Sequence, residues 1–121
     1  MAFGPSVPIL RSFDEAQARD FYLRYLGFEV LFEHRFGEGM PLYMGIRRGG
    51  CELHISEHHG DATPGSAVRI ATDVDALLAA LTERGHPRLR PGIVEQPWGA
   101  REIMLTDPFG NRLVFWQEAQ A

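Results

Sequence analysis

The sequence predicts an α+β fold in which two β-α-β-β-β modules form a curved mixed sheet around a cleft. The order strand, helix, three strands occurs twice, at about 5–57 and 66–118, and a Gly-, Asp- and Pro-rich linker separates the copies at 58–65. A chain of 121 residues is long enough for one domain with one core. We therefore expect 1–121 to be a single domain. Each helix covers one face of its sheet, which leaves the other face concave and open.

The first module begins with a short strand at 6–11. Ser12 and Glu15 have the spacing of a capping box, which predicts that a helix starts at Ser12. Gly27 fits the left-handed residue that ends such a helix. The helix shows one apolar stripe, formed by Ala18, Phe21, Tyr22 and Tyr25. Three strands are expected after it, at 28–34, 41–47 and 51–56.

The second module repeats this pattern. A strand is expected at 67–72, and Thr72 and Asp75 occupy the capping-box positions before a helix that ends at Gly85. Its apolar stripe is Val74, Leu77, Leu78 and Leu81. Three further strands are expected at 88–94, 101–106 and 112–117, with the turn residues Asp107-Pro108-Phe109-Gly110-Asn111 between the last two.

Composition narrows the class of protein. The net charge of −4 argues against nucleic acid as a partner and is compatible with a cationic small ligand. No apolar run approaches the length of a membrane span, and the N-terminus lacks the pattern of a signal peptide. Cys51 is the single cysteine, which excludes an internal disulfide and suits a reducing compartment. We therefore expect a cytoplasmic protein that is not bound to a membrane.

Two segments carry a resemblance to a known superfamily. The helix segment from Asp20 to Phe28 resembles the first helix of vicinal oxygen chelate proteins, and Asp107 to Asn111 resembles their final hairpin turn. This superfamily contains glyoxalase I, extradiol dioxygenases, metal-dependent fosfomycin-resistance enzymes and bleomycin-resistance proteins. The resemblance covers nearly the whole chain. It implies the glyoxalase/bleomycin-resistance fold but does not choose among these activities.

Three further segments resemble the bleomycin-resistance branch. They are Val7-Pro8-Ile9-Leu10, Leu53-His54-Ile55-Ser56, and Glu95-Gln96-Pro97-Trp98-Gly99 with Arg101-Glu102 after it. The resemblance implies a homodimer that sequesters a bleomycin-like glycopeptide antibiotic, alone or as its metal complex, in clefts at the subunit interface. It implies no catalysis and no cofactor. Pro8 matches a proline that accompanies exchange of the first strand between subunits.

Enzymes of the superfamily hold a divalent metal with one ligand from each of four strands. By register, the matching positions are Val7, His54, Arg69 and Val114. Valine has no donor atom, and arginine remains protonated and repels a cation. His54 alone does not hold a metal, so we predict that no metal is bound. A stretched site of Glu52, His54, His58 and Glu102 is the alternative that the sequence leaves open.

Four aromatic residues are candidate ligand contacts. Trp98, held between Pro97 and Gly99 on a loop, is a platform for stacking on flat rings or on a cation, or else it plugs the end of the barrel. Phe32 faces either the cleft or the core, and Phe36 lies in the loop that follows it. Trp116 shares a strand face with Val114 and either lines the cleft or closes the dimer interface.

Three polar residues complete the candidate site. His54 is either a pH-dependent hydrogen-bonding partner of the ligand or a structural histidine. Glu102 is expected to face the cleft beside Met104 and to attract a cation. Arg69 is unfavourable for a cationic ligand unless it pairs with Glu52 or Glu102; unpaired, it indicates an anionic or carbonyl-bearing ligand. Tyr43 and Met44 alternate, so one of them lines the cleft.

Three functions follow from these residues. The first is non-catalytic sequestration of a bleomycin-type antibiotic. The second is a metal-free relative that binds another small molecule, which Arg69 favours. The third is a metal-dependent lyase, isomerase or dioxygenase, which the absence of ligands at the metal positions disfavours.

Overall fold

The computed structural model describes residues 1–119, which contain two four-stranded sheets and two helical segments. In the first half, the elements are β1 (Ile9–Arg11), α1 (Glu15–Ala18), the π-helical η1 (Arg19–Tyr25), β2 (Glu29–His34), β3 (Tyr43–Arg48) and β4 (Cys51–Ser56). In the second half they are β5 (Ala67–Ala71), α2 (Val74–Arg84), β6 (Val94–Glu95), β7 (Ala100–Thr106) and β8 (Arg112–Glu118). No helix in this part of the chain is long and apolar enough to cross a membrane.

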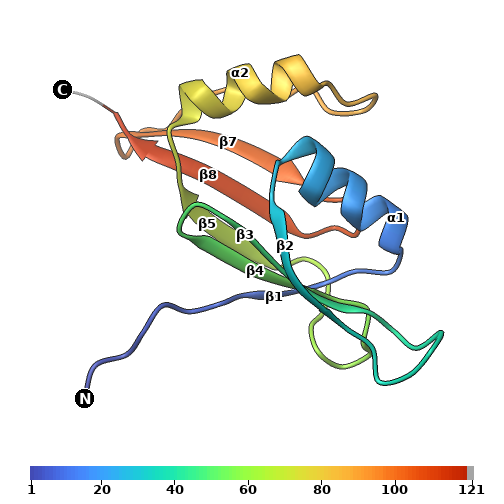
Figure 1. The fold of residues 1–121 in the computed structure, drawn as a ribbon. Coiled ribbons are helices and arrows are strands. Elements are labelled where there is room, and N and C mark those ends of the chain that lie inside the picture. The colour runs from blue at the N-terminus through green and yellow to red at the C-terminus, as the bar shows by residue number, and fades with distance from the viewer. Residues whose placement is uncertain (120–121) are drawn as a thin grey trace.

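The two sheets have the same strand order. Sheet A runs β1-β4-β3-β2 and sheet B runs β5-β8-β7-β6 (Figure 1). In each, the first strand pairs in parallel with the last strand of its half, and the other pairs are antiparallel. Both sheets are therefore mixed, as the sequence predicts.

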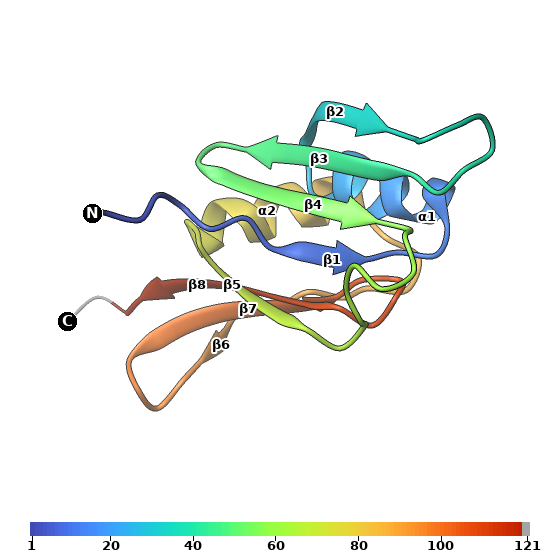
Figure 2. The same ribbon diagram turned by 90° about the horizontal axis from the view of Figure 1, so that it is seen from below.

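Both helical segments lie on the same side of the sheets, so the opposite face is left without a helix. Seen from below, the strands lie in front of α1 and α2 (Figure 2). The core lies between the helices and the sheets, where most of the predicted stripe residues are buried: Ala18, Phe21, Tyr22 and Tyr25 from the first helical segment, with Val74, Leu77 and Leu81 from α2. Leu78, also predicted in the second stripe, is only partly buried against this core. We call the open, helix-free face of each sheet its concave face.

A buried hydrogen-bonded joint connects the two halves. The hydroxyl of Tyr22 on η1 donates to Oδ2 of Asp107 in the β7–β8 turn at 2.5 Å. Asp107 also accepts from the backbone N–H groups of Phe109 and Asn111, and the Asn111 amide donates to the carbonyl of Arg11. Burial and the neighbouring Asp107 raise the pKa of Tyr22, so this hydroxyl keeps its proton.

The helix starts differ from the prediction. Asp14, not Ser12, caps α1 by accepting from the N–H of Gln17, and Asp73, not Thr72, caps α2 by accepting from Ala76. Ser12 still donates its N–H to Ser56, and Thr72 donates its N–H to Trp116. Both residues therefore continue the hydrogen bonding of the sheets one residue past the strand ends, and each helix is capped one or two residues later than the capping pattern indicates.

Two predicted strands are shorter than expected. The strand predicted at 88–94 is reduced to Val94–Glu95, because Pro87 and Pro91 lack N–H donors and Nδ1 of His86 accepts from the N–H groups at 88 and 89. The strand predicted at 6–11 begins only at Ile9. Residues 1–7, which we call the N-terminal arm, are exposed and extend away from the sheets (Figures 1 and 2).

Candidate functional site

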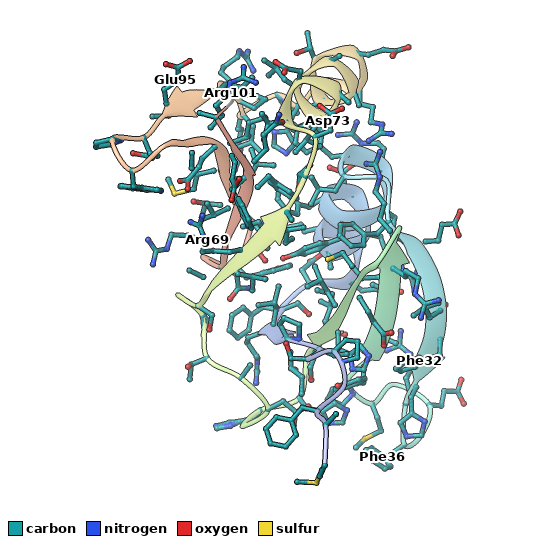
Figure 3. The ribbon with its side chains drawn as sticks, turned by 90° about the vertical axis from the view of Figure 1, so that its left-hand side faces the viewer. Phe32, Phe36, Arg69, Asp73, Glu95 and Arg101 are labelled. Carbon is teal, nitrogen blue, oxygen red and sulfur yellow. The ribbon has the colours of Figure 1, made fainter. Side chains whose placement is uncertain are left out.

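The predicted site residues fall into two groups on different sheets. Phe32, Phe36 and His54 belong to sheet A and the loop after β2, while Arg69, Trp98, Glu102 and Trp116 belong to sheet B and its β6–β7 turn. Phe32 and Phe36 lie toward one end of the molecule, and Glu95 and Arg101 lie toward the opposite end (Figure 3). Arg69 lies between the two ends, and its side chain points outward. Within residues 1–119, no hydrogen bond, ion pair or ring contact joins the two groups.

Strand alternation decides which side chains of sheet A face outward. Met44 and Ile46 of β3 are buried on the helix side, so Tyr43 and Gly45 lie on the concave face. Tyr43, rather than Met44, is thus the residue that the face presents. Gly45 is opposite Phe32 in the register, and a Cβ at Gly45 would overlap the phenyl ring. Glycine is required here because the ring lies flat over its backbone.

The rings of Phe32, Tyr43 and His54 contact one another on sheet A, and we call these three rings the ring wall. Phe32 stacks nearly parallel to Tyr43, with centroids 6.1 Å apart and an interplanar angle of 10°, and meets the ring of His54 edge-on at 5.2 Å. Phe32 remains 41% exposed, which excludes a place in the core of the chain. Phe36 is 78% exposed and contacts the rings of His34 and His58. This wall offers aromatic surface to a flat ligand or to a partner.

Two rings of this wall, His54 and Tyr43, also belong to a chain of hydrogen bonds that begins at Glu52. Nε2 of His54 lies 2.8 Å from Oε2 of Glu52, and Nδ1 lies 2.7 Å from the hydroxyl of Tyr43. Glu52 also accepts from Arg47 at 3.3 Å. The hydrogen bond from His54 lowers the pKa of Glu52, which stays ionised, and burial raises the pKa of Tyr43, which stays a phenol. Both ring nitrogens of His54 are thus engaged by protein groups.

An ion pair marks sheet B. Arg69 donates to Oε2 of Glu102 at 3.0 Å, and the Gln96 amide donates to Oε1 at 3.3 Å. The Glu102 side chain is only 8% exposed, whereas that of Arg69 is 50% exposed. The guanidinium also lies over the ring of Trp116 at 5.5 Å. Of the two partners that the sequence allows for Arg69, the structure selects Glu102, whose charge is therefore already compensated.

Trp98 stands on the turn between β6 and β7. The turn is closed by backbone bonds from Gln96 to Ala100 and from Gly99 to Gln96, and Gly99 has a φ of 89°. The Trp98 side chain is 66% exposed, so within one chain it does not plug the end of the sheet. Val94 and Met104 are exposed as well, at 55% and 58%. This end of sheet B thus presents apolar surface to the outside.

The positions that match the metal ligands of the resembling enzymes can now be assigned by register. Ile9 pairs with His54 in sheet A as Arg69 pairs with Val114 in sheet B, so Ile9, not Val7, holds the first position. Isoleucine lacks a donor atom just as valine does. Among residues 1–119, no three His, Cys, Asp or Glu side chains gather as metal ligands, so the stretched site through His58 and Glu102 is not assembled.

A cavity lies at the junction of the two sheets. Its volume is about 760 Å³, and its lining includes Pro8, Cys51, Glu52, Arg69 and Ile70. It exists because β1 pairs only with His54–Ser56, which leaves Cys51–Leu53 without a neighbour facing β5. Burial raises the pKa of Cys51. The Pro8 carbonyl accepts from the N–H of His54.

Comparison with known proteins covers the whole chain. A family model described as glyoxalase superfamily protein matches residues 1–121. A search of curated proteins finds no match. The crystal structure of TnmS3, an antibiotic-binding protein from Streptomyces sp. CB03234, is 27% identical over 98% of this chain and 99% of that one, with a TM-score of 0.74.

Two bleomycin-related structures have the same fold. A bleomycin-binding protein crystallised with bleomycin is 25% identical over 96% of this chain and 99% of that one, with a TM-score of 0.69. The bleomycin-resistance determinant of transposon Tn5 is 24% identical over 98% and 100%, with a TM-score of 0.75. The expected glyoxalase/bleomycin-resistance fold is thus confirmed.

Proposed function

The chain belongs to the glyoxalase superfamily, and we propose that it binds and sequesters a bleomycin-type glycopeptide antibiotic without catalysis. The observation that carries this proposal is Trp98, a largely exposed indole held on a short turn. A buried aromatic stack is worth about 0.5–1.5 kcal/mol beyond the apolar area that it covers. An exposed, preorganised ring on a concave sheet is therefore suited to a flat heteroaromatic ligand. The known binding of bleomycin by one solved structure of this fold supports the choice.

The complete cleft of this proposal needs a second chain. The ring wall of Phe32, Tyr43 and His54 lies on sheet A, with Phe36 in the loop after β2, and Trp98 lies on the β6–β7 turn of sheet B. Within residues 1–119, no ring contact joins the two groups. We therefore place sheet A of one subunit opposite sheet B of its partner, so that a homodimer has two equal clefts. Each cleft then contains the ring wall of one chain and the tryptophan of the other.

The N-terminal arm supplies a second contact between the subunits of this dimer. The arm includes Phe3, which is 91% exposed, and is followed by Pro8 beside the cavity between β4 and β5. Both strands have unpaired edges there, so an extended segment fits between them. In the proposed dimer, the arm of one subunit enters this cavity in its partner. Deleting residues 1–7 is expected to shift the mass measured by light scattering from twice 13.6 kDa toward 13.6 kDa; an unchanged dimer contradicts the exchange.

Stacking and burial, rather than local charge, are the main sources of affinity in this proposal. Glu102 is paired with Arg69, so it does not present a free carboxylate to a cation. The net charge of −4 still attracts a cationic ligand at long range. No metal, cofactor or covalent step enters this function, and the cytoplasm is the proposed compartment.

Calorimetric titration with bleomycin tests the proposal. We expect saturation at one ligand per chain, with and without Cu²⁺ on the drug. Trp98→Ala should weaken binding by about tenfold or more, because losing an aromatic hot spot costs about 1–2 kcal/mol or more. Phe13→Ala is the matched control, since Phe13 is also exposed but packs on Phe109 and Arg11 and is not a proposed ligand contact. Absence of saturable binding by the wild type contradicts the function.

A second function is supported by Arg69. Its guanidinium is half exposed although it is paired, and it can donate to an anionic or carbonyl group on a ligand. A thermal-shift screen of anionic and carbonyl metabolites tests this alternative, because a ligand raises apparent stability by mass action. If an anionic or carbonyl metabolite binds tightly and bleomycin does not, the result would favour this second function. A stoichiometric, chelator-sensitive metal in the purified protein would instead select the metal-dependent enzyme.

A further inference from the structure

The chain Glu52–His54–Tyr43 orders its protons when the imidazole of His54 carries a single N–H. The carboxylate of Glu52 can only accept, so the His54 nitrogen 2.8 Å away, Nε2, carries the hydrogen. In a neutral imidazole the other nitrogen, Nδ1, then only accepts. The hydroxyl of Tyr43, 2.7 Å from Nδ1, must therefore donate to it.

This arrangement leaves the Tyr43 oxygen with lone pairs but no free proton. Its ring lies on the concave face and stacks on Phe32 at an angle of 10°. The surface above His54 thus presents one hydrogen-bond acceptor and two π faces. Such a surface attracts an N–H donor, and a positively charged donor also gains from the negative faces of the rings.

The charged groups identified around the chain are Glu52, Arg47 and Asp61. Glu52 is ionised, and its carboxylate contacts both His54 and Arg47. The Arg47 side chain is 54% exposed and is directed to this carboxylate. On the neighbouring β2, His34 is opposite Tyr43, and Asp61 from the linker contributes a negative charge near the phenol. On β1, the partner of His54 is the apolar Ile9. No arginine bonds to Tyr43 or His54 among the described residues.

We propose that Tyr43, Phe32 and the Glu52–His54 pair form a subsite for a cationic nitrogen group, such as an ammonium or guanidinium. The inference deepens the proposed function and rests on it in one respect: the subsite would hold the cationic part of the ligand whose flat rings meet Trp98. Tyr43 contacts the cation, and Glu52 and His54 are positioning residues that hold the hydroxyl proton inward.

Small probes test the subsite independently of any antibiotic. The 2-phenylethylammonium ion and its neutral N-acetyl derivative carry the same ring and differ in charge. Each is titrated into the full-length protein while the ring resonances of Tyr43 and Phe32 are followed by NMR. We expect the ammonium to bind about fivefold more tightly, the ratio that a net hydrogen bond of about 1 kcal/mol gives. Tyr43→Phe keeps the stacked ring and should reduce this ratio to below about twofold.

Tyr25→Phe is the matched control. It removes a buried hydroxyl that has no hydrogen-bond partner within the described chain, and it should leave the ratio unchanged. A second readout is the nitrogen spectrum of His54. The wild type should show the Nε2–H tautomer, and Glu52→Ala, which removes the acceptor, should yield a mixture and a smaller ratio.

Several results would overturn the subsite. They are an Nδ1–H tautomer in the wild type, equal binding of the two probes, an unchanged ratio in Tyr43→Phe, or no saturable shift with about 20 mM ammonium, well above the millimolar Kd expected of a fragment. A protein that passes these tests but does not bind bleomycin would refute the proposed antibiotic and retain the subsite. A protein that binds bleomycin but fails them would refute the subsite alone.

Discussion

The two concave faces have the same strand order but different chemistry. In sheet A the central register line is Ile9, His54, Gly45 and Phe32, and in sheet B the corresponding line is Arg69, Val114 and Met104. Sheet A therefore has the hydrogen-bonded chain Glu52–His54–Tyr43 beside the ring of Phe32. Sheet B has an ion pair over an indole, and a second, exposed indole on its turn.

The difference shows how one framework acquires two chemically different surfaces. A glycine in sheet A allows a phenyl ring to lie flat on the strand, whereas sheet B has an exposed methionine at the same point. Neither line has the ligand set of a metal site. The two faces complement each other, which is why we expect them to meet across a dimer interface rather than to act separately.

The largest expected effect comes from breaking the joint that holds the two sheets in one body. Asp107→Ala leaves the hydroxyl of Tyr22 and the N–H groups of Phe109 and Asn111 without their acceptor. Removing a buried charged partner costs about 3–5 kcal/mol, so urea denaturation should show a loss of that size. Asp75→Ala, which removes an exposed carboxylate paired with Arg101, should cost much less, because an exposed ion pair is screened by solvent. Similar losses for both would contradict the role of the joint.

The next effect separates the two faces at equivalent positions. Gly45→Ala forces the ring of Phe32 off the strand and should destabilise the protein by about 1–3 kcal/mol, as overpacking does. Met104→Ala at the matching point of sheet B should change stability by less than about 1 kcal/mol, because Met104 is exposed. Thermal or urea unfolding compares the two variants. The comparison fails if Met104→Ala is the more damaging.

A smaller effect distinguishes the ion pairs of the faces. Arg69→Gln leaves the buried carboxylate of Glu102 with only the Gln96 amide, and should cost about 1–2 kcal/mol. Arg47→Gln on sheet A removes an exposed partner of Glu52 and should cost about 0–1 kcal/mol. Replacing both Arg69 and Glu102 by leucine should restore much of the loss. Equal costs for the two single variants would show that burial of Glu102 does not matter.

Much of the fold follows from sequence periodicity, and the rest depends on contacts between distant residues. The helix stripes were predictable because apolar residues recur at helical spacing, as Phe21 and Tyr25 do in the first helical segment and Leu77 and Leu81 do in α2. The helix starts were not, since Ser12 and Thr72 look like caps until their N–H groups are seen to bond to other strands. In the same way, alternation could not choose between Tyr43 and Met44. Gly45 in a strand interior was the available signal that a ring covers the backbone.

The site was only partly predictable for the same reason. Pairing of Arg69 with Glu102 was one of two options, and the register of β5, β8 and β7 decides between them. The hydrogen-bonded chain through Tyr43 was missed, because its members come from two strands and only their pairing brings them together. The roles of Trp98, Phe32, Phe36 and Trp116 in binding remain predictions.

The central claim, that each cleft joins sheet A of one chain to sheet B of its partner, is tested by mixing two variants. Phe32→Ala and Trp98→Ala chains carrying different tags are refolded together, and the mixed dimer is purified and titrated with bleomycin. In the proposed arrangement one cleft of the mixed dimer has neither substitution and the other has both. We predict one site per mixed dimer with wild-type affinity, although both parent dimers bind weakly. A mixed dimer with no site tighter than those of its parents would contradict the claim.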